Sequence, residues 1–351
     1  MAQNKVELIV PESLFGSRAD HVISILLNDY SRSRIKQWIE KGFVLVQNEI
    51  ITPKRKMLTG EKIIVYIQPD DKELQYQPEP IKLDVIYSDN DIAVINKPSG
   101  LVVHPAEGNW TGTLLNGILD IFPDNKLLPR AGIVHRLDKD TSGLLVIALN
   151  EISQVNLIKQ LQAKTVYREY RAIVYGNIIL NGLVDEPIGR HPQNRVKMSV
   201  NKVNGKPAIT KYEPLEVFQH HTYLKCILET GRTHQIRVHM QYIGKPLVGD
   251  PMYGFKKIFP FKGMPKKFID LVINFPRQAL HAKKLGLVHP ATNKKMSWDI
   301  KLPDDFFDLL NIMRDAPLKD KQLHTYLYNN DDHEDTLDYE NIDEDFDLDD
   351  N

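Results

Sequence analysis

The stretch AGIVHRLDKDTSGLLVIALN, residues 131–150, constrains the fold of this chain more than any other. Its second half contains an unbroken apolar run, residues 144–149, which is typical of a strand buried on both faces of a sheet. The shorter run at 132–134 predicts a second buried strand. Between the two runs lie the titratable residues His135, Arg136, Asp138, Lys139 and Asp140. A simple reversal of the chain needs none of them, so we expect a site at the edge of a sheet.

Short β-rich runs broken by glycine and proline turns extend through the rest of the chain after residue 81, with occasional helices such as 151–163. Strands and helices do not alternate regularly, which favours a mixed α+β domain over a doubly wound fold. In residues 166–176, strand alternation puts Tyr170 on the apolar side, so its ring should face the interior. In THQIRVHM, the same alternation predicts a strand with Arg237 on its polar side.

The first 67 residues predict a small separate unit with two helices followed by short strands. Ser17 and Asp20 match a capping box for the first helix, whereas Ser31 can cap the second and Gly42 can end it. The polar side of the second helix carries the cations Arg32, Arg34 and Lys36. Such a surface either binds RNA or is simply a solvated face.

Two further segments differ in composition from these units. Residues 68–80 are polar, contain three prolines and predict a linker, so the second domain spans 81–330. Residues 331–351 contain 12 Asp and Glu and no Lys or Arg, which predicts a disordered acidic tail. The remaining 330 residues have 45 Lys and Arg against 34 Asp and Glu, a net charge of +11. Such a body attracts polyanions, most commonly nucleic acid, and the tail either competes with RNA or aids solubility.

Several classes of protein are disfavoured by what the sequence lacks. A single cysteine, Cys226, suits a reducing compartment, and neither a signal peptide nor a membrane span is evident, so we expect a cytoplasmic protein. His234 and His239 are too badly spaced to ligate one metal, and no HExxH, CxxC, P-loop or dinucleotide motif occurs. Ser142 lacks a nucleophile elbow. What remains is an aspartate among cations, with neither metal nor cofactor expected.

Four motifs, KPSGLVVHP, HRLDKDTSGLLVIA, GRTHQIRVHM and RQALHA, resemble in order those of the RluA-type pseudouridine synthases. Because SRADHVISILL, SRSRIKQWIEKGFVLVQNEI and LTGEKIIVY resemble an S4 RNA-binding domain, the RluD-like subgroup is the most similar. The resemblance covers roughly residues 10–307. It implies a pseudouridine synthase fold with a mainly antiparallel sheet, preceded by an S4 (αL-like) domain at 1–67.

The resemblance also implies a function: cofactor-free isomerisation of uridine to pseudouridine in large-subunit (23S) ribosomal RNA, by a monomeric enzyme whose partner is RNA. The same reaction on tRNA, or RNA binding without catalysis, remains an alternative. Asp138 corresponds to the catalytic aspartate, Tyr170 to the active-site tyrosine and Arg237 to the basic partner, with Arg232 as the alternative position. Arg136 corresponds to the arginine that fills the space of the flipped nucleotide. His135 and Arg232 are the further predicted substrate contacts, and Arg168 replaces the family's usual lysine.

Overall fold

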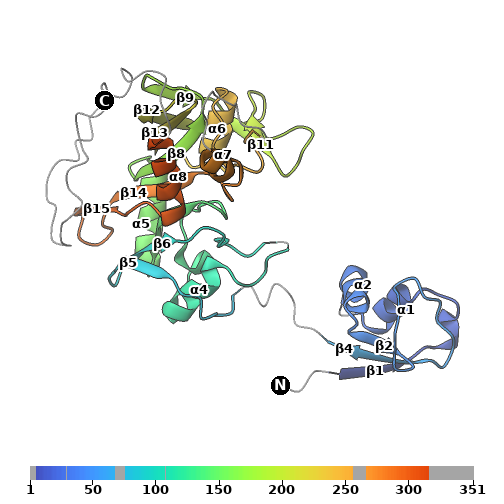
Figure 1. Ribbon diagram of the computed structural model, residues 1–351. Helices are drawn as coiled ribbons and strands as arrows, with labels where there is room; N and C mark the ends of the chain where they lie inside the picture. Colours follow the sequence, from blue (N-terminus) through green and yellow to red (C-terminus); the bar gives the residue numbers. More distant parts are fainter. Residues whose placement is uncertain (1–4, 29, 68–75, 107, 256–265, 316–351) are drawn as a thin grey trace. The chain divides into compact units, whose positions relative to one another are not determined.

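The computed structural model describes residues 5–28, 30–67, 76–106, 108–255 and 266–315. The chain divides into two compact units, Met1–Gln77 and Pro78–Asn351 (Figure 1). None of the helices in these ranges has the length and apolar character needed to cross a bilayer.

The boundary region lies only partly within the described residues. Most of the predicted linker at 68–80, and all of the predicted acidic tail at 331–351, fall outside them. Glu79, which the sequence assigns to the linker, donates its backbone N–H to the carbonyl of Asn116 at 3.0 Å. This residue therefore belongs structurally to the second unit.

The first unit is a four-stranded antiparallel sheet in the order β1-β4-β2-β3, with two helices. Its elements are β1 (Lys5–Ile9), a 3-10 turn η1 (Glu12–Leu14), α1 (Ala19–Leu26), α2 (Arg32–Glu40), β2 (Val44–Val46), β3 (Glu49–Ile50) and β4 (Lys62–Tyr66). Both helices contribute to one core with the sheet, through buried side chains such as Val22, Ile23, Ile35, Ile39, Val44 and Ile63. The predicted small unit of helices and short strands is confirmed.

The helix ends of this unit test the capping predictions. Ser31 caps α2 as predicted, because its hydroxyl accepts the backbone N–H of Arg34 at 3.3 Å. Gly42 follows α2 with φ +78°, a left-handed conformation that suits glycine. The capping box is wrong: α1 begins at Ala19 without a side-chain cap, and the Asp20 carboxylate instead accepts hydrogen bonds from two arginines.

The second unit is built on a nine-stranded sheet in the described residues, ordered β5-β6-β7-β14-β8-β13-β12-β9, with β15 also paired to β14. The strands are β5 (Asp84–Ser88), β6 (Ile92–Lys97), β7 (Ser142–Ala148), β8 (Tyr167–Tyr175), β9 (Gly182–Asp185), β12 (Ile209–Val217), β13 (His221–Leu228), β14 (Leu280–Val288) and β15 (Lys295–Asp299). Paired strands run antiparallel except β7 and β14. The predicted α+β class with a mixed, mainly antiparallel sheet is confirmed.

The parallel pairing of β7 with β14 begins beside the charged loop, where His281 aligns with Ser142 and Ala282 with Gly143. Gly143 has φ +115°, and a Cβ there would lie 2.2 Å from the carbonyl oxygen of Ala282. Only glycine permits so close an approach of the two backbones. The glycine of DTSG therefore fixes where the loop enters the sheet.

Helices cover both faces of this sheet. On one face, α4 (Leu114–Ile121) and α6 (Gln235–Tyr242) share a core with Tyr170, which faces inward as strand alternation predicts. On the other face lie α5 (Glu151–Gln162), α7 (Lys266–Ile273) and α8 (Asp304–Arg314). A separate two-stranded sheet pairs β10 (Ile188–Arg190) with β11 (Met198–Val200).

The strand predicted at 132–134 does not form. A 3-10 turn, η3 (Pro129–Gly132), follows η2 (Pro123–Leu127), and Ile133 makes a single bridge to Ile147. The cause is a run of left-handed residues, Arg130, Ala131 and Gly132, with φ of 55°, 51° and 77°. This run turns the chain, so the buried apolar side chains that follow it belong to a loop.

Candidate active site

Asp138 lies in the loop 133–141, which connects η3 to the central strand β7. The side chain of Leu137 is buried in the core and holds the loop against it. His135 anchors it from the side, because its Nε2 accepts the backbone N–H of Val146 at 3.0 Å. The carboxylate of Asp138 is thus presented from a loop with fixed ends, and its side chain is 15% exposed.

Two buried cations hold the second half of this loop. Lys97, at the end of β6, donates its ammonium hydrogens to the carbonyl oxygens of Pro98, Leu101 and Lys139, at 2.7, 2.9 and 2.9 Å. Arg277 donates from Nη1 to the carbonyl of Asp140 at 3.3 Å. The carbonyl groups of the neighbouring residues Lys139 and Asp140 therefore each accept a hydrogen bond from a cation that lies far away in the sequence.

Arg237 lies on α6 and not on the predicted strand. Its Nη1 donates to Oδ2 of Asp138 at 3.0 Å, so the structure brings these two predicted residues together. The strand prediction failed because residues 235–240 are all buried. Only the last two residues of α6, Gln241 and Tyr242, are exposed, so its first six residues have no exposed polar stripe and show no period of 3.6.

A second carboxylate, Asp250, completes the site and was missed by sequence reasoning. Its oxygens accept from Nε and Nη2 of Arg237 at 2.7 and 3.0 Å, and its side chain is fully buried. It also accepts the backbone N–H groups of Met252 and Tyr253, both at 2.9 Å. Burial acts to lower the pKa of Arg237, but hydrogen bonds to Asp250 and the charges of both carboxylates raise that pKa well above its ordinary value. Arg237 is a permanent, immobilised cation.

Tyr170 is on β8 and is buried, with 6% of the residue exposed. Burial raises the pKa of Tyr170 to about 12; the charge of Arg168 opposes this shift, and that of Asp138 adds to it. Arg168 is buried two residues earlier, where its Nη2 donates to the carbonyls of Leu228 and Glu229 at 3.4 and 3.2 Å. Its Nε has no hydrogen-bond partner among the described residues. A neutral phenol and a buried guanidinium therefore lie side by side on the Asp138 side of the sheet.

The remaining predicted site residues occupy different environments. Arg136 is exposed beside Asp138, whereas burial lowers the pKa of His135 to about 3 and its Nε2 is used by the backbone. Arg232 donates from Nε to the carbonyl of Pro207 at 3.0 Å and does not pair with Asp138. Arg237, and not the alternative Arg232, is therefore the partner of the aspartate.

In the first unit, the predicted RNA-binding cations on α2 already have partners. Arg32 donates to the buried Asp20 at 3.1 Å, and Lys36 lies 3.7 Å from Glu40. The guanidinium of Arg34 lies 5.1 and 5.2 Å from the ring centroids of Tyr30 and Trp38. The side chains of Arg32 and Lys36 remain 49% and 54% exposed, so both can also bind a phosphate group of RNA.

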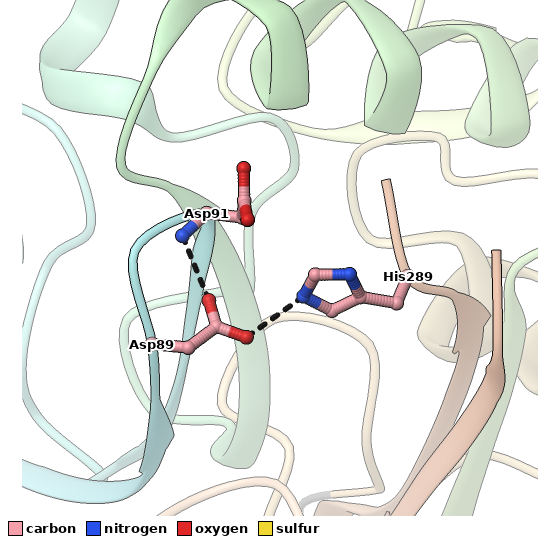
Figure 2. A group of neighbouring side chains, drawn as sticks. All are labelled: Asp89, Asp91 and His289. Carbon is pink, nitrogen blue, oxygen red and sulfur yellow. Dashed lines mark hydrogen bonds and ion pairs between the residues drawn. The ribbon is translucent and has the colours of Figure 1, made fainter. Parts of the chain in front are cut away.

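One group of metal-ligand type lies elsewhere in the second unit: Asp89, Asp91 and His289 (Figure 2). The Nδ1 atom of His289 accepts the backbone N–H groups of Ala291 and Thr292, at 3.3 and 3.1 Å. In the neutral ring Nε2 then carries the hydrogen, and it donates to Oδ2 of Asp89 at 2.7 Å. The imidazole has no lone pair left for a cation.

The carboxylates of this group are engaged as well. Asp89 Oδ1 accepts the backbone N–H of Asp91 at 2.7 Å (Figure 2). Asp91 Oδ1 accepts from the side chains of Asn150 and Ser153, at 2.8 and 3.0 Å. The group therefore acts as a hydrogen-bonded tether between the β5–β6 turn and the segment after β14, in which all three side chains take part.

The model of the RNA pseudouridylate synthase family matches residues 91–242, and that of the S4 domain matches residues 17–63. The first range contains Asp138, Tyr170 and Arg237. A mixed sheet that presents an arginine-bound aspartate, in a chain with an S4 domain, defines a class of RNA-modifying enzymes.

Relatives narrow this class further. A ribosomal large subunit pseudouridine synthase D from Neisseria meningitidis serogroup A is 48% identical over 312 residues, covering 89% of this chain and 83% of the relative. The protein of that name from Escherichia coli strain K12 is 46% identical over 316 residues, covering 90% and 96%. A solved structure, human RNA pseudouridylate synthase domain containing 4, is 25% identical with a TM-score of 0.50, covering 66% of this chain and 93% of that one. The chain belongs to the RNA pseudouridylate synthase family and is an RNA pseudouridine synthase.

Proposed function

We propose that this enzyme isomerises specific uridines of large-subunit ribosomal RNA to pseudouridine, with Asp138 as the reactive carboxylate. The observation that carries the assignment of the site is the 3.0 Å contact between Arg237 and Asp138, with Arg237 itself locked by Asp250. The substrate is proposed from the relatives, whose names specify the large ribosomal subunit.

The reaction moves one bond and one proton. The N1–C1′ bond of uridine breaks, the uracil turns, C5 bonds to C1′, and the hydrogen lost from C5 is balanced by one gained at N1. Asp138 either attacks C1′ or removes a ribose proton. In both routes the carboxylate must be oriented, and a charge-assisted hydrogen bond from an immobilised guanidinium supplies that orientation.

The target base must leave its helix to reach Asp138. Extruding a nucleotide costs a few kcal/mol, which is partly recovered when an aromatic ring stacks on the base. In our proposal Tyr170 supplies the ring, and the exposed Arg136 occupies the space left in the RNA. Arg232 contributes a further contact at the rim, whereas His135 supports Asp138 by holding the loop through Val146.

The S4 unit supplies affinity for large RNA through Arg32, Arg34 and Lys36. Contacts of this kind go to phosphates and carry no base specificity. We propose that the protein acts as a monomer in the cytoplasm, without a membrane partner. Selection of the target uridine then belongs to the second unit.

The test compares Asp138→Asn with Asp140→Asn, the same change two residues along the same loop. Pseudouridines are mapped in ribosomal RNA and tRNA from cells that carry each variant in place of the wild-type gene. We expect Asp138→Asn to abolish large-subunit modification with RNA affinity within a few fold, and Asp140→Asn to retain it. Loss of pseudouridine from tRNA alone would identify the alternative substrate. Near-normal modification by Asp138→Asn would show that Asp138 is not the reactive carboxylate.

Tyr170→Phe separates the roles of the tyrosine ring and hydroxyl. The ring is kept, so we expect folding and RNA affinity to be retained while turnover falls. Equal losses in affinity and turnover would instead make the hydroxyl a structural group.

A further inference from the structure

His234 has an unusual backbone at the start of α6. Its φ and ψ are 57° and 24°, the left-handed region, although it carries a Cβ, and its side chain does not cap the helix. Non-glycine residues in this conformation are strained, and such strain concentrates where a side chain must be aimed at a site. The conformation points to a purpose for the His234 imidazole beyond ending a loop.

The imidazole lies between Tyr253 and Asp138. Tyr253 Oη accepts the backbone N–H of Met198, on β11, at 2.8 Å, and lies 2.9 Å from Nδ1 of His234. The other ring nitrogen, Nε2, lies 3.9 Å from Oδ1 of Asp138. The ring therefore connects the Tyr253 hydroxyl to the catalytic carboxylate.

These contacts determine which ring nitrogen carries hydrogen. Burial raises the pKa of Tyr253, so its phenol stays protonated, and burial also lowers the pKa of His234, so its ring stays neutral. We assign the hydroxyl hydrogen of Tyr253 to Nδ1 of His234, because the other ring nitrogen faces the carboxylate of Asp138, which can only accept a hydrogen bond. The hydrogen of the neutral ring is then on Nε2, facing Asp138.

We propose that His234 is a positioning residue for Asp138, and that its Nε2–H closes onto Oδ1 when RNA occupies the site. The carboxylate is then held at both oxygens, because Arg237 already donates to Oδ2 at 3.0 Å. Two donors, one on each oxygen, fix the carboxylate plane against rotation, which a single donor cannot do. Tyr253 acts indirectly, because its hydroxyl holds the His234 ring in the tautomer that carries its hydrogen on Nε2.

The inference rests on the proposed role of Asp138. It is tested on the full-length enzyme by two substitutions, each of which keeps the function of only one of the two imidazole nitrogens. Asparagine tolerates the left-handed backbone and places its amide near Nδ1, so His234→Asn keeps a partner for Tyr253 but no donor toward Asp138. His234→Gln reaches as far as Nε2 and can donate there. Single-turnover rates and dissociation constants are measured with ribosomal RNA from cells that lack the enzyme.

We expect His234→Asn to lower the single-turnover rate about tenfold or more, the value of one hydrogen bond to a charged group, with RNA affinity within twofold. His234→Gln should recover most of that rate. Tyr253→Phe should lower the rate less, and adding it to His234→Asn should cause little further loss, since both changes act through one ring. Melting temperatures of the variants identify any loss that is due to unfolding.

Three results would overturn the proposal: a wild-type rate for His234→Asn, an equally slow His234→Gln, or fully additive losses in the double variant. Each is distinct from a failure of the proposed function, which requires Asp138→Asn to stay active. An inactive Asp138→Asn beside a fully active His234→Asn would remove His234 from the mechanism and leave Asp138 in it.

Discussion

Replacing Asp250 with asparagine tests whether Arg237 must be locked from behind to act on Asp138. The side chain is fully buried and accepts two hydrogen bonds from the guanidinium, at 2.7 and 3.0 Å. Asparagine keeps Oδ1, which can still accept the backbone N–H groups of Met252 and Tyr253. Its amide hydrogens would face those of the guanidinium, however, so the buried cation loses its fully enclosed counter-charge.

Removing one partner of a buried ion pair costs about 3–5 kcal/mol. We expect the lower end, about 3 kcal/mol, because Asp138 remains beside Arg237 and still neutralises part of its charge. With a urea m-value of about 3 kcal/mol per M, the unfolding midpoint falls by about 1 M. Turnover should fall tenfold or more, since the Nε bond of Arg237 to Oδ2 is lost and an amide group, whose hydrogens repel the guanidinium, stands in its place.

The control is Glu216→Gln, which alters another arginine–carboxylate pair of the same unit. Arg314 donates from Nε to Glu216 at 2.9 Å, between α8 and β12 and remote from Asp138 in the sheet order. Its loss should lower stability by about 2 kcal/mol without changing turnover. Urea unfolding and single-turnover assays of the full-length variants are compared. If Asp250→Asn unfolds at the wild-type midpoint, or is destabilised yet turns over normally, the locking role of Asp250 is refuted.

Three further changes probe other parts of the molecule. Arg168→Lys should keep most of the activity, because it retains a buried cation beside Tyr170, whereas Arg168→Met should lower turnover about tenfold with little change in RNA affinity; equal rates for both would exclude a role for the charge. Burial lowers the pKa of Lys97 to about 7, against the charges of Asp140 and Asp138. An unfolded lysine binds its proton up to about pH 10.4, so between these values the unfolded state holds more protons and wild-type stability gains up to about 1.4 kcal/mol per pH unit relative to Lys97→Met. Urea midpoints of both proteins at pH 6.5 and 9.5 check this, and a difference independent of pH contradicts it. In the S4 unit, Lys36→Ala should reduce the slope of log affinity against log salt by about 0.7 to 0.9 without changing stability. Arg32→Ala should also destabilise the unit, because the buried Asp20 then keeps Arg18 as its only arginine partner in the described residues; identical stabilities would show that the Arg32–Asp20 pair contributes nothing.

Local patterns predicted those features that depend on neighbouring residues. The Ser31 cap, the end of α2 at Gly42 and the inward face of Tyr170 follow from capping chemistry, positive φ and strand alternation. The capping box failed because Asp20 found stronger partners than a backbone N–H. Its carboxylate is buried against Arg18 and Arg32, and the second of these is twelve residues away.

Features that depend on tertiary packing could not be predicted in this way. The contact of Arg237 with Asp138 was predicted correctly, but Arg237 was placed on a strand and lies on a helix. The first six residues of that helix are all buried, so its sequence shows no helical periodicity of apolar residues. Asp250 was missed because no local pattern reveals which carboxylate meets a given guanidinium thirteen residues earlier. A general physical argument nevertheless pointed to such a residue. A buried arginine that pairs with the reactive aspartate needs a second carboxylate that holds it in place and takes no part in the reaction.

The place of β14 in the sheet has a consequence for biosynthesis. This strand consists of residues 280–288 but lies between β7 and β8 in the sheet. The loop with Asp138 leads into β7, and β8 carries Tyr170. Asp138 and the side chains that contact it have all been synthesised by residue 253, yet until β14 is added, β7 and β8 each lack a neighbour. Chains fold from the N-terminus as they emerge, and unpaired strand edges invite aggregation. A nascent or truncated chain should therefore contain all the catalytic groups without activity and depend on chaperones, and insertion of the last central strand would be the step that turns the enzyme on.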